Sequence, residues 1–299
     1  MSSQNKAYMF GLMAVFFWST VATAFKISLS HLTPAQLVLY ATMSSSLFLL
    51  SWMLISRRGA ELVSGIRRYW RVSLLFGGLN PFVYYLILFQ AYDRLPAQEA
   101  QAINYTWALT MALLAVPVLK QRLHRFDMVA ALMCYMGVLI IATRGHPLSL
   151  NFSDLGGVGF ALLSTLLWSS YWLLNTRDQR EPVLGLTLNF LFSLPLILIW
   201  CGVTDELKPV AWQGLAGAAY IGVFEMGLTF VLWLQAMRLT TSAARISNLI
   251  FLSPLMSLVF ISFLLGEQIL PSTIAGLGAI LLGLVVQQWG ARQAPPAAA

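Results

Sequence analysis

The stretch Ala102-Ile103-Asn104-Tyr105-Thr106-Trp107-Ala108 places an amide in the middle of a long apolar segment. An amide without a partner in hydrocarbon costs roughly 4–8 kcal/mol, so we expect Asn104 to face protein or water rather than lipid. On one continuous helix, Asn104 would share a face with the residues one and two turns later, Trp107, Ala108 and Met111. This arrangement predicts a surface that joins an amide to an indole ring.

The same environment recurs in the second half of the chain. When Arg94-Leu95 is aligned with Arg238-Leu239, the ungapped shift of 144 residues carries Asn104 onto Asn248. Two asparagines at matching positions in apolar segments predict one cavity, built from two copies of a unit, in which the two amides meet.

Composition identifies the broad class of the protein. Of 299 residues, 59% are hydrophobic and only 10% are charged, with a mean hydropathy of +0.75. Soluble domains average about 25% charged residues, so the chain is predicted to be a membrane protein. Its apolar runs last about 20 residues, which indicates helices rather than an outer-membrane barrel. Cys134 and Cys201 both lie in apolar runs and predict no disulfide framework.

Ten apolar segments are long enough to be candidate transmembrane helices. They are residues 7–28, 36–55, 70–92, 97–119, 126–143, 156–176, 183–203, 211–236, 243–265 and 271–289. Fourteen of the 18 Lys and Arg residues fall at the termini and in alternate connections, against four (Lys26, Arg94, Arg144 and Lys208) on the other side. This bias predicts that both termini are cytoplasmic. The basic loops are therefore read as topology signals beside anionic lipid, not as a nucleic-acid surface.

The chain also repeats itself. Residues 10–19, FGLMAVFFWS, resemble residues 160–169, FALLSTLLWS, and a shift of 145 carries Gly77 onto Gly222. Each unit crosses the membrane an odd number of times, so the second copy starts on the opposite side of the membrane. The second copy must therefore be inverted relative to the first. We therefore predict two inverted five-helix repeats, residues 1–148 and 149–299, around a central cavity. Inverted repeats suit alternating access, whereas the alternative is that duplication merely built a stable ten-helix bundle.

These features resemble the drug/metabolite transporter superfamily, in its EamA-type branch of two fused five-helix modules. The resemblance covers nearly the whole chain. It rests on Trp18-Ser19, Trp168-Ser169, Leu264-Leu265-Gly266-Glu267, Gly276 and Gly283. It implies export across the bacterial inner membrane through a central cavity lined by helices 1, 3, 4, 6, 8 and 9.

A narrower resemblance concerns substrate. The residues Asn104-Tyr105-Thr106-Trp107-Ala108 resemble an Asn-Tyr-Leu-Trp-Pro stretch of bacterial aromatic amino acid exporters. Thr106 stands where that stretch has Leu, and Ala108 where it has Pro. The missing proline predicts a straighter helix at this point.

Polar and aromatic residues at mid-depth in the spans form the predicted substrate site. An amino acid needs polar groups for its ammonium and carboxylate, and flat apolar surfaces for its side chain. The candidates are Trp18, Asn80, Tyr84, Tyr85, Asn104, Tyr105, Trp107, Trp168, Tyr171, Trp172, Tyr220, Glu225, Trp233 and Asn248. The alternative is that the aromatic residues serve in packing or at the membrane interface, as expected of those near span ends.

Glu225 is singled out because it is a carboxylate well inside a predicted span, and the repeat places it opposite Asn80. An acid at this depth is a functional candidate by default. It would either bind a substrate ammonium or carry a proton. The structural alternative is a buried acid held by a hydrogen-bond partner. Lys26 lies at the outer end of its span. It would either extend its ammonium group to the membrane interface or bind the carboxylate of a substrate.

The sequence contains no catalytic signature. It lacks the G-x-x-x-x-G-K-[ST], H-E-x-x-H and G-x-S-x-G motifs, and its three histidines are scattered among loops. We therefore predict a transporter with no cofactor and no metal, whose partners are the bilayer and a small molecule, most plausibly an amino acid. We expect a monomer or a weak homodimer. The other functions considered are a broad drug or metabolite exporter and a non-transporting scaffold or channel-like protein.

Overall fold

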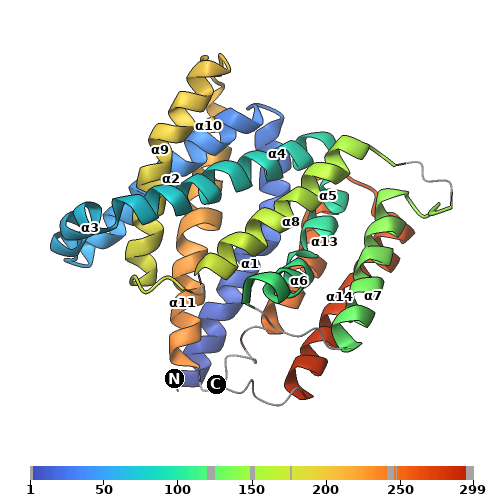
Figure 1. The fold of residues 1–299 in the computed structure, drawn as a ribbon. Helices are drawn as coiled ribbons and strands as arrows, with labels where there is room; N and C mark the ends of the chain where they lie inside the picture. Colours follow the sequence, from blue (N-terminus) through green and yellow to red (C-terminus); the bar gives the residue numbers. More distant parts are fainter. Residues whose placement is uncertain are drawn as a thin grey trace. The chain divides into compact units, whose positions relative to one another are not determined.

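The computed structural model describes residues 3–119, 125–148, 152–175, 177–240, 246 and 248–293. Every described element is a helix (Figure 1). In chain order these are α1 Ser3–Leu29, α2 Pro34–Ile55, α3 Gly59–Gly77, η1 Gly78–Val83, α4 Tyr84–Arg94, α5 Ala97–Asn104, α6 Trp107–Leu119, α7 Arg125–Ala142, α8 Leu155–Asn175, α9 Pro182–Val203, α10 Trp212–Tyr220, η2 Ile221–Leu228, α11 Thr229–Leu239, η3 Asn248–Phe251, α13 Leu252–Leu265 and α14 Pro271–Gln293.

Each predicted span coincides with one helix or with a run of consecutive helices, which confirms an all-helical membrane protein of ten helices. Seven described helices are long and apolar enough to cross a membrane, and two shorter ones, Phe126–Ala142 and Leu249–Leu265, are also apolar. The third run begins at Gly59 rather than at the predicted residue 70. The start of the ninth predicted span, residues 243–245 and 247, lies outside the described residues.

The fourth predicted span is not one continuous helix. Helix α5 ends at Asn104, a turn follows at Tyr105 and Thr106, and α6 starts at Trp107. The Thr106 hydroxyl donates to the carbonyl of Ile103 at 2.8 Å within this turn. The prediction of one continuous helix over this span is therefore wrong, and the interruption occurs without a proline.

The chain divides into two compact units. Unit 1 comprises Met1–Asp93 and Gln179–Glu267, and unit 2 comprises Arg94–Asp178 and Gln268–Ala299. Each unit takes helices from both halves of the chain, so the compact units are not the sequence repeats. We describe each unit by itself.

In unit 1 the second helix of each repeat packs against the third helix of the other repeat. Helix α3 packs on α9, and α2 packs on η2 and α10. A side chain at Gly77 would collide with the backbone carbonyl of Asn189, and one at Gly222 would collide with that of Ala41. Glycine is required at both positions because the helix backbones touch there. The symmetry of these two contacts supports the internal repeat.

The starts of α2 and α9 are also equivalent. Each has a proline at its first position, Pro34 or Pro182, where the missing N–H costs nothing. The Thr33 side chain accepts from the Gln36 amide at 3.3 Å, and the Glu181 carboxylate accepts from the Leu184 amide at 2.8 Å. The repeat thus keeps the cap at this helix start but changes its chemistry from a hydroxyl to a carboxylate.

The third helix of each repeat contains a π-helical segment. In η1, Pro81 removes an N–H and forces Asn80 into an extended conformation, with φ −143° and ψ 117°. The matching segment η2 contains no proline, and there the Thr229 hydroxyl donates to the Phe224 carbonyl. The shift of 145 residues carries Asn80 onto Glu225, so each repeat has a polar residue where its third helix departs from α-helical geometry. Such segments often occur at functional sites.

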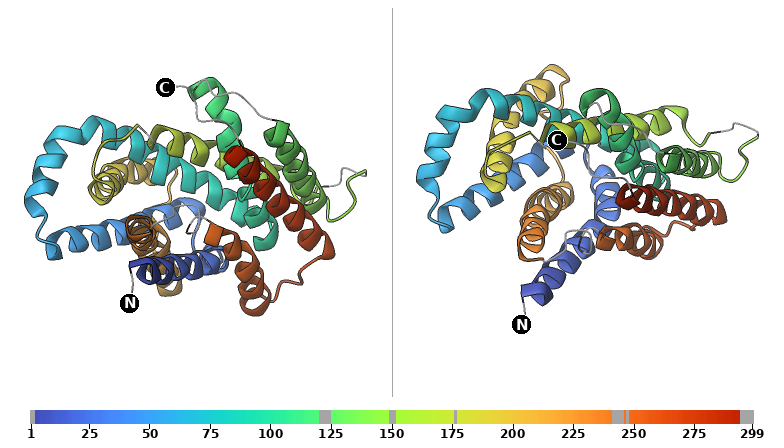
Figure 2. Two further views of the ribbon diagram at one scale, coloured as in Figure 1. Left: turned by 90° about the horizontal axis from the view of Figure 1, so that it is seen from below. Right: turned by 60° about the horizontal axis from the view of Figure 1, so that its bottom comes forward.

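In unit 2, α7 and α14 form the tightest helix pair and lie side by side in Figures 1 and 2. Gly137 and Gly276 bring these two backbones together, because neither residue has a side chain at the point of contact. The remaining helices of unit 2 pack with α8 against α6 and α5.

Candidate functional site

Eight of the predicted site residues lie in unit 1. They are Trp18 on α1, Asn80 in η1, Tyr84 and Tyr85 at the start of α4, Tyr220 at the end of α10, Glu225 in η2, Trp233 on α11 and Asn248 at the start of η3. Asn248 begins a 3₁₀ turn, while its side chain lies outside the described part of the structure. Asn104 ends α5, so both asparagines stand where a membrane helix is interrupted.

A carboxylate cluster in unit 1 centres on Glu225. The Tyr85 hydroxyl donates to Oε1 of Glu225 at 3.1 Å, and the Trp18 indole is a second polar neighbour of this carboxylate. Among the described residues, Oε2 of Glu225 has no partner at ordinary hydrogen-bond geometry, although it is buried. A buried acceptor without a partner is costly, roughly 1–3 kcal/mol, so this oxygen is suited to accept from a ligand or to hold a proton.

Asn80 repeats this pattern. Its side chain is only 1% exposed, and within the described residues its Oδ1 finds no hydrogen-bond donor. Both members of the repeat pair, Asn80 and Glu225, therefore carry a buried acceptor oxygen that has no hydrogen-bond partner among the described residues.

Aromatic rings surround the Trp18 end of this unit. The Trp18 ring lies 5.2 Å from that of Trp233, and the Phe17 ring stacks on Phe224 at 4.8 Å. The hydroxyls of Thr20 and Tyr220 lie 2.7 Å apart. Tyr220 is thus held by a hydrogen bond from α1. Thr20 was not predicted, although it follows Trp18-Ser19 in the same polar patch of an apolar helix.

The other six predicted residues lie in unit 2, and four of them form an aromatic cluster. Trp168 is its centre: its ring meets that of Trp107 edge-on at 6.5 Å, stacks on Tyr171 at 5.7 Å and meets Trp172 edge-on at 5.7 Å. The Trp172 indole nitrogen is buried, and none of the described residues accepts a hydrogen bond from it. The cluster therefore combines flat apolar faces with one open donor.

Hydrogen bonds hold the interrupted helix against α8 beside this cluster. Asn104 donates from Nδ2 to the Ser164 hydroxyl at 2.9 Å, and the Ser169 hydroxyl donates to the Trp107 carbonyl at 2.8 Å. Asn104 thus has a protein partner. This agrees with the expectation that its amide would face protein or water rather than lipid. Tyr105 occupies the turn and is half-buried. Ser164 and Ser169 belong to the repeated first-helix motif, a signal that sequence reasoning had available for them.

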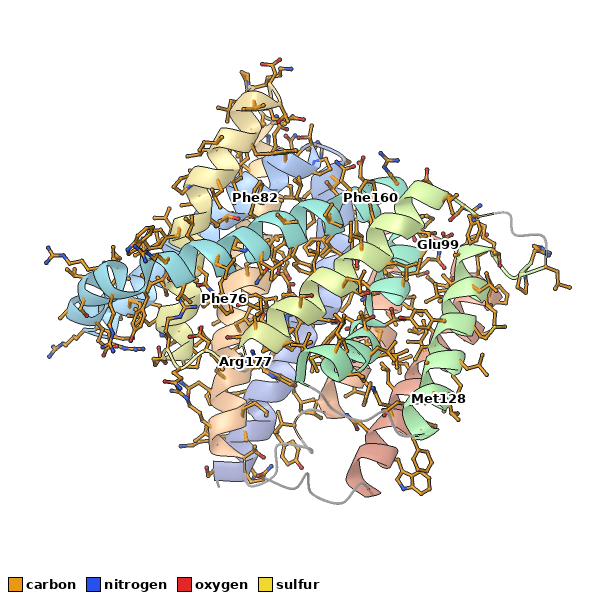
Figure 3. The ribbon with its side chains drawn as sticks, viewed as in Figure 1. Phe76, Phe82, Glu99, Met128, Phe160 and Arg177 are labelled. Atoms are coloured by element: carbon orange, nitrogen blue, oxygen red, sulfur yellow. The ribbon has the colours of Figure 1, made fainter. Side chains whose placement is uncertain are left out.

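Two buried charged residues were also missed. Glu99, labelled in Figure 3, is 1% exposed; Arg144 Nε lies 3.3 Å from its Oε1, and the Ser153 hydroxyl donates to its Oε2. Arg180 donates to the Ser73 hydroxyl at 2.8 Å and to Asn189 Oδ1 at 3.1 Å. Both lie near span ends, where sequence alone does not distinguish a buried ion from an exposed one. They brace helices within their own units.

Lys26 has a structural partner. Its ammonium donates to the Tyr92 carbonyl at 2.7 Å, near the C-terminal end of α4. A cation at this position satisfies a carbonyl that the helix leaves open. In the described part of the chain, no group of three His, Cys, Asp or Glu residues is placed to hold a metal ion.

The chain was compared with known protein families. The model of the EamA-like transporter family matches it twice, over residues 5–143 and 155–287. The double match covers most of the chain and confirms that it contains two repeats.

Several proteins are similar in sequence. An uncharacterized transporter of Clostridium kluyveri is 25% identical over 203 residues, which cover 62% of this chain and 65% of that protein, just under two thirds of its length. The aromatic amino acid exporter YddG of Ancylobacter novellus is 27% identical over 236 residues, 77% of this chain and 79% of the exporter. Protein PecM of Dickeya dadantii is 28% identical over 226 residues, 73% of each chain.

The fold is also similar to a known crystal structure. That structure has a TM-score of 0.66 and 20% identity, and the alignment covers 97% of this chain and 99% of the other. At this identity the likeness concerns the fold alone.

Proposed function

The chain belongs to the EamA-like transporter family, and we propose that it exports amino acids, aromatic ones above all, across the bacterial inner membrane. Membership of this family makes it a secondary transporter, not an enzyme. The observation that carries the substrate proposal is the aromatic cluster of Trp107, Trp168, Tyr171 and Trp172 on unit 2.

The aromatic cluster suits a flat apolar side chain. Edge-on and stacked ring pairs contribute roughly 0.5–1.5 kcal/mol beyond the burial of apolar area, with geometry that favours another ring. The open indole N–H of Trp172 is a donor for a carboxylate, and within the described residues it has no acceptor. We assign this cluster to recognition of the aromatic ring and the carboxylate.

The carboxylate cluster on unit 1 suits an ammonium group. Glu225 keeps one oxygen on Tyr85 and leaves the other open. An ammonium group gives three donors and a compensating charge, so it satisfies this oxygen fully. We assign Glu225 to the substrate ammonium; coupling to a proton is the alternative role for the same oxygen.

The relatives support transport more broadly than they support one substrate. One similar protein is an aromatic amino acid exporter, and others are uncharacterized transporters. A broader drug or metabolite exporter is the second candidate, favoured by the apolar character of the Trp168 cluster. Our proposal includes alternating access around the central cavity expected from the inverted repeat, cytoplasmic termini, and a monomer or weak homodimer.

Counterflow in liposomes tests the proposal. Purified protein is reconstituted with unlabelled tryptophan inside, and uptake of labelled tryptophan is followed over time. A transporter gives a transient overshoot, whereas an open pore gives none. Leucine, glutamate and an unrelated amphipathic drug compete in parallel. Competition by aromatic amino acids above all others supports the proposal; equal competition by the drug favours the broader exporter.

The Trp107→Ala variant tests the aromatic cluster in this assay. We expect tryptophan transport to fall about fivefold to tenfold, because one ring pair and its buried area are lost. The matched control is Trp212→Ala, since Trp212 is 72% exposed at the start of α10. Both variants should elute as folded protein. Wild-type flux in Trp107→Ala would remove the ring from the site.

A further inference from the structure

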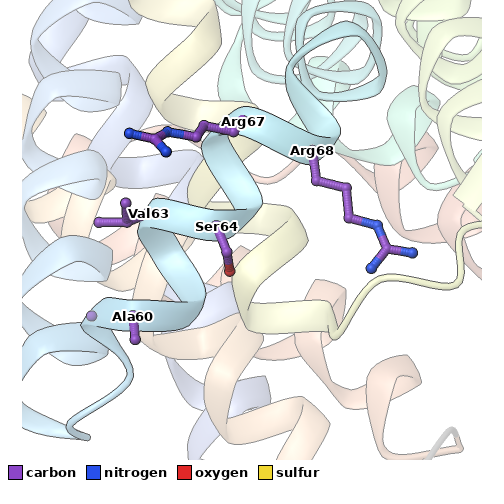
Figure 4. Close-up of a pocket in the computed structure, with 6 residues that line it drawn as sticks. Ala60, Val63, Ser64, Arg67 and Arg68 are labelled. Carbon is purple, nitrogen blue, oxygen red and sulfur yellow. The ribbon is translucent and has the colours of Figure 1, made fainter.

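Helix α3 carries a groove that the transport site does not use. The groove is lined by Gly59, Ala60, Val63, Ser64, Arg67 and Arg68, all from this one helix (Figure 4). The other side of α3 is buried: Leu62 packs in one cluster with Leu184 and Leu188 of α9. The groove is therefore an exposed surface feature of unit 1.

The sequence around the groove is strongly basic. Five of the chain's 18 Lys and Arg residues lie here, Arg57, Arg58, Arg67, Arg68 and Arg71, and two of them, Arg67 and Arg68, line the groove. Arg58 is neutralised by Glu61 at 2.6 Å and by Glu181 at 2.9 Å. In the described ranges, no carboxylate forms an ion pair with the other four. These four arginines therefore give this surface an excess of positive charge among the described residues.

Aromatic rings position two of these guanidinium groups. Arg68 lies 5.3 Å from the centre of the Tyr69 ring, and Arg71 lies 5.1 Å from that of Trp70. A guanidinium over a ring keeps the N–H donors at its edge free for an oxyanion. In Figure 4 the Arg67 and Arg68 side chains extend on either side of Ser64.

Apolar side chains are exposed on the same helix. Val63 is 57% exposed, Ile66 39% and Trp70 45%. This part of α3 precedes the apolar span predicted from residue 70, and on that prediction it would meet the phosphate groups and the first acyl carbons of a bilayer. Tryptophan and arginine are both typical of this level.

We propose that the α3 groove binds the headgroup of an anionic phospholipid, such as phosphatidylglycerol. Arg67 and Arg68 contact the phosphate, and Val63 and Trp70 cover the glycerol and the upper acyl chain. A zwitterionic lipid brings its own cation into a surface that already has an excess of positive charge, so it binds less well. This site is separate from the proposed transport function.

Native mass spectrometry tests the proposal on the full chain. Protein in detergent is mixed with equal amounts of phosphatidylglycerol and phosphatidylcholine, and the lipids retained after activation are counted. We expect preferential retention of phosphatidylglycerol. The triple variant Arg67→Gln/Arg68→Gln/Arg71→Gln should lower that retention at least about tenfold, given the roughly 1 kcal/mol that each basic residue contributes near an anionic surface.

A charge-matched control distinguishes a site from general attraction. The triple variant Lys6→Gln/Arg177→Gln/Lys208→Gln removes three exposed cations outside the groove. It should keep the wild-type preference. Equal loss in both triple variants, or equal retention of the two lipids by wild type, overturns the proposal. If the first triple variant does not fold, the single variants Arg67→Gln and Arg68→Gln decide, each with an expected loss of about fivefold.

Discussion

The third helices of the two repeats share a helix contact and differ in backbone and chemistry. Each has a glycine, Gly77 just before η1 or Gly222 within η2, that allows close packing on a second helix. One presents the neutral amide of Asn80, and the other presents the carboxylate of Glu225. Duplication has kept the glycine contact, whereas Asn80 is extended before Pro81 and Glu225 lies in a segment without a proline. The comparison teaches that packing constrains both repeats alike, whereas the site needs only one anion.

The largest expected effect tests the shared packing. Gly77→Ala and Gly222→Ala should each cost about 1–3 kcal/mol or more, because the new methyl group meets a backbone carbonyl that has no room to move. Thermal unfolding in detergent measures the loss. Gly78→Ala is the matched control, because its methyl group would make an ordinary 3.5 Å contact with Leu196. A large loss in only one of the first two variants would show that the repeats do not share this contact.

The next largest effect tests the difference between the carboxylate of Glu225 and the amide of Asn80. Glu225→Gln should lower transport at least about tenfold, since a charge-assisted hydrogen bond contributes roughly 1.5–3 kcal/mol. Asn80→Ala should lower it about fivefold, as expected for a neutral bond. Liposome counterflow measures both. A pH gradient that acts equally on wild type and Glu225→Gln would show that Glu225 carries no proton, and equal losses in the two variants would contradict the distinction between amide and acid.

A smaller effect concerns the hydrogen bond that Tyr85 donates to the Glu225 carboxylate. Tyr85→Phe removes the hydroxyl that donates to Glu225 at 3.1 Å, and we expect transport to fall about threefold to fivefold. The same change in a Glu225→Gln background should have little further effect, because its partner has already changed. Additive losses would mean that the two residues act independently.

The smallest effect compares the caps of the second helices. Burial alone would raise the pKa of the Glu181 carboxyl, but hydrogen bonds from Arg58, the Leu184 amide and Arg238 hold it below its ordinary value of 4.5. The ionised cap therefore stabilises the fold at neutral pH, and this contribution disappears as the pH falls below about 4.5 and through the folded-state pKa.

Thermal unfolding against pH checks this comparison. Glu181→Gln should lose about 1 kcal/mol at pH 7 and converge on wild type toward pH 3. Thr33→Ala should lose about 1 kcal/mol with a much weaker pH dependence, since the group it removes does not ionise. A pH-independent deficit in Glu181→Gln would show that the charge of this cap contributes nothing.

Much of the fold was predictable because a bilayer imposes a simple length rule on apolar segments. The ten spans, the repeat and the pairing of Asn80 with Glu225 all followed from hydropathy and residue shifts. The break after Asn104 did not, because no proline or glycine marks the turn at Tyr105 and Thr106. Of the predicted site residues, Trp107, Trp168, Tyr171 and Trp172 lie together in the structure, and their role in binding a substrate stays a prediction. The meeting of Asn104 with Asn248 stays a prediction.

The sequence by itself determined that the chain is a helical membrane protein built from two repeats, because the cost of exposing peptide groups and charges to lipid leaves few other structures. Only the tertiary structure decided which helices touch. It assigned α7 to α14, set Gly77 and Gly222 against backbone carbonyls, and placed Tyr85 on one oxygen of Glu225 while leaving the other open. Lipid and protein interiors are equally apolar, so hydropathy marks a span but carries no information about its partner. Shape and hydrogen bonding, which appear only in three dimensions, select that partner.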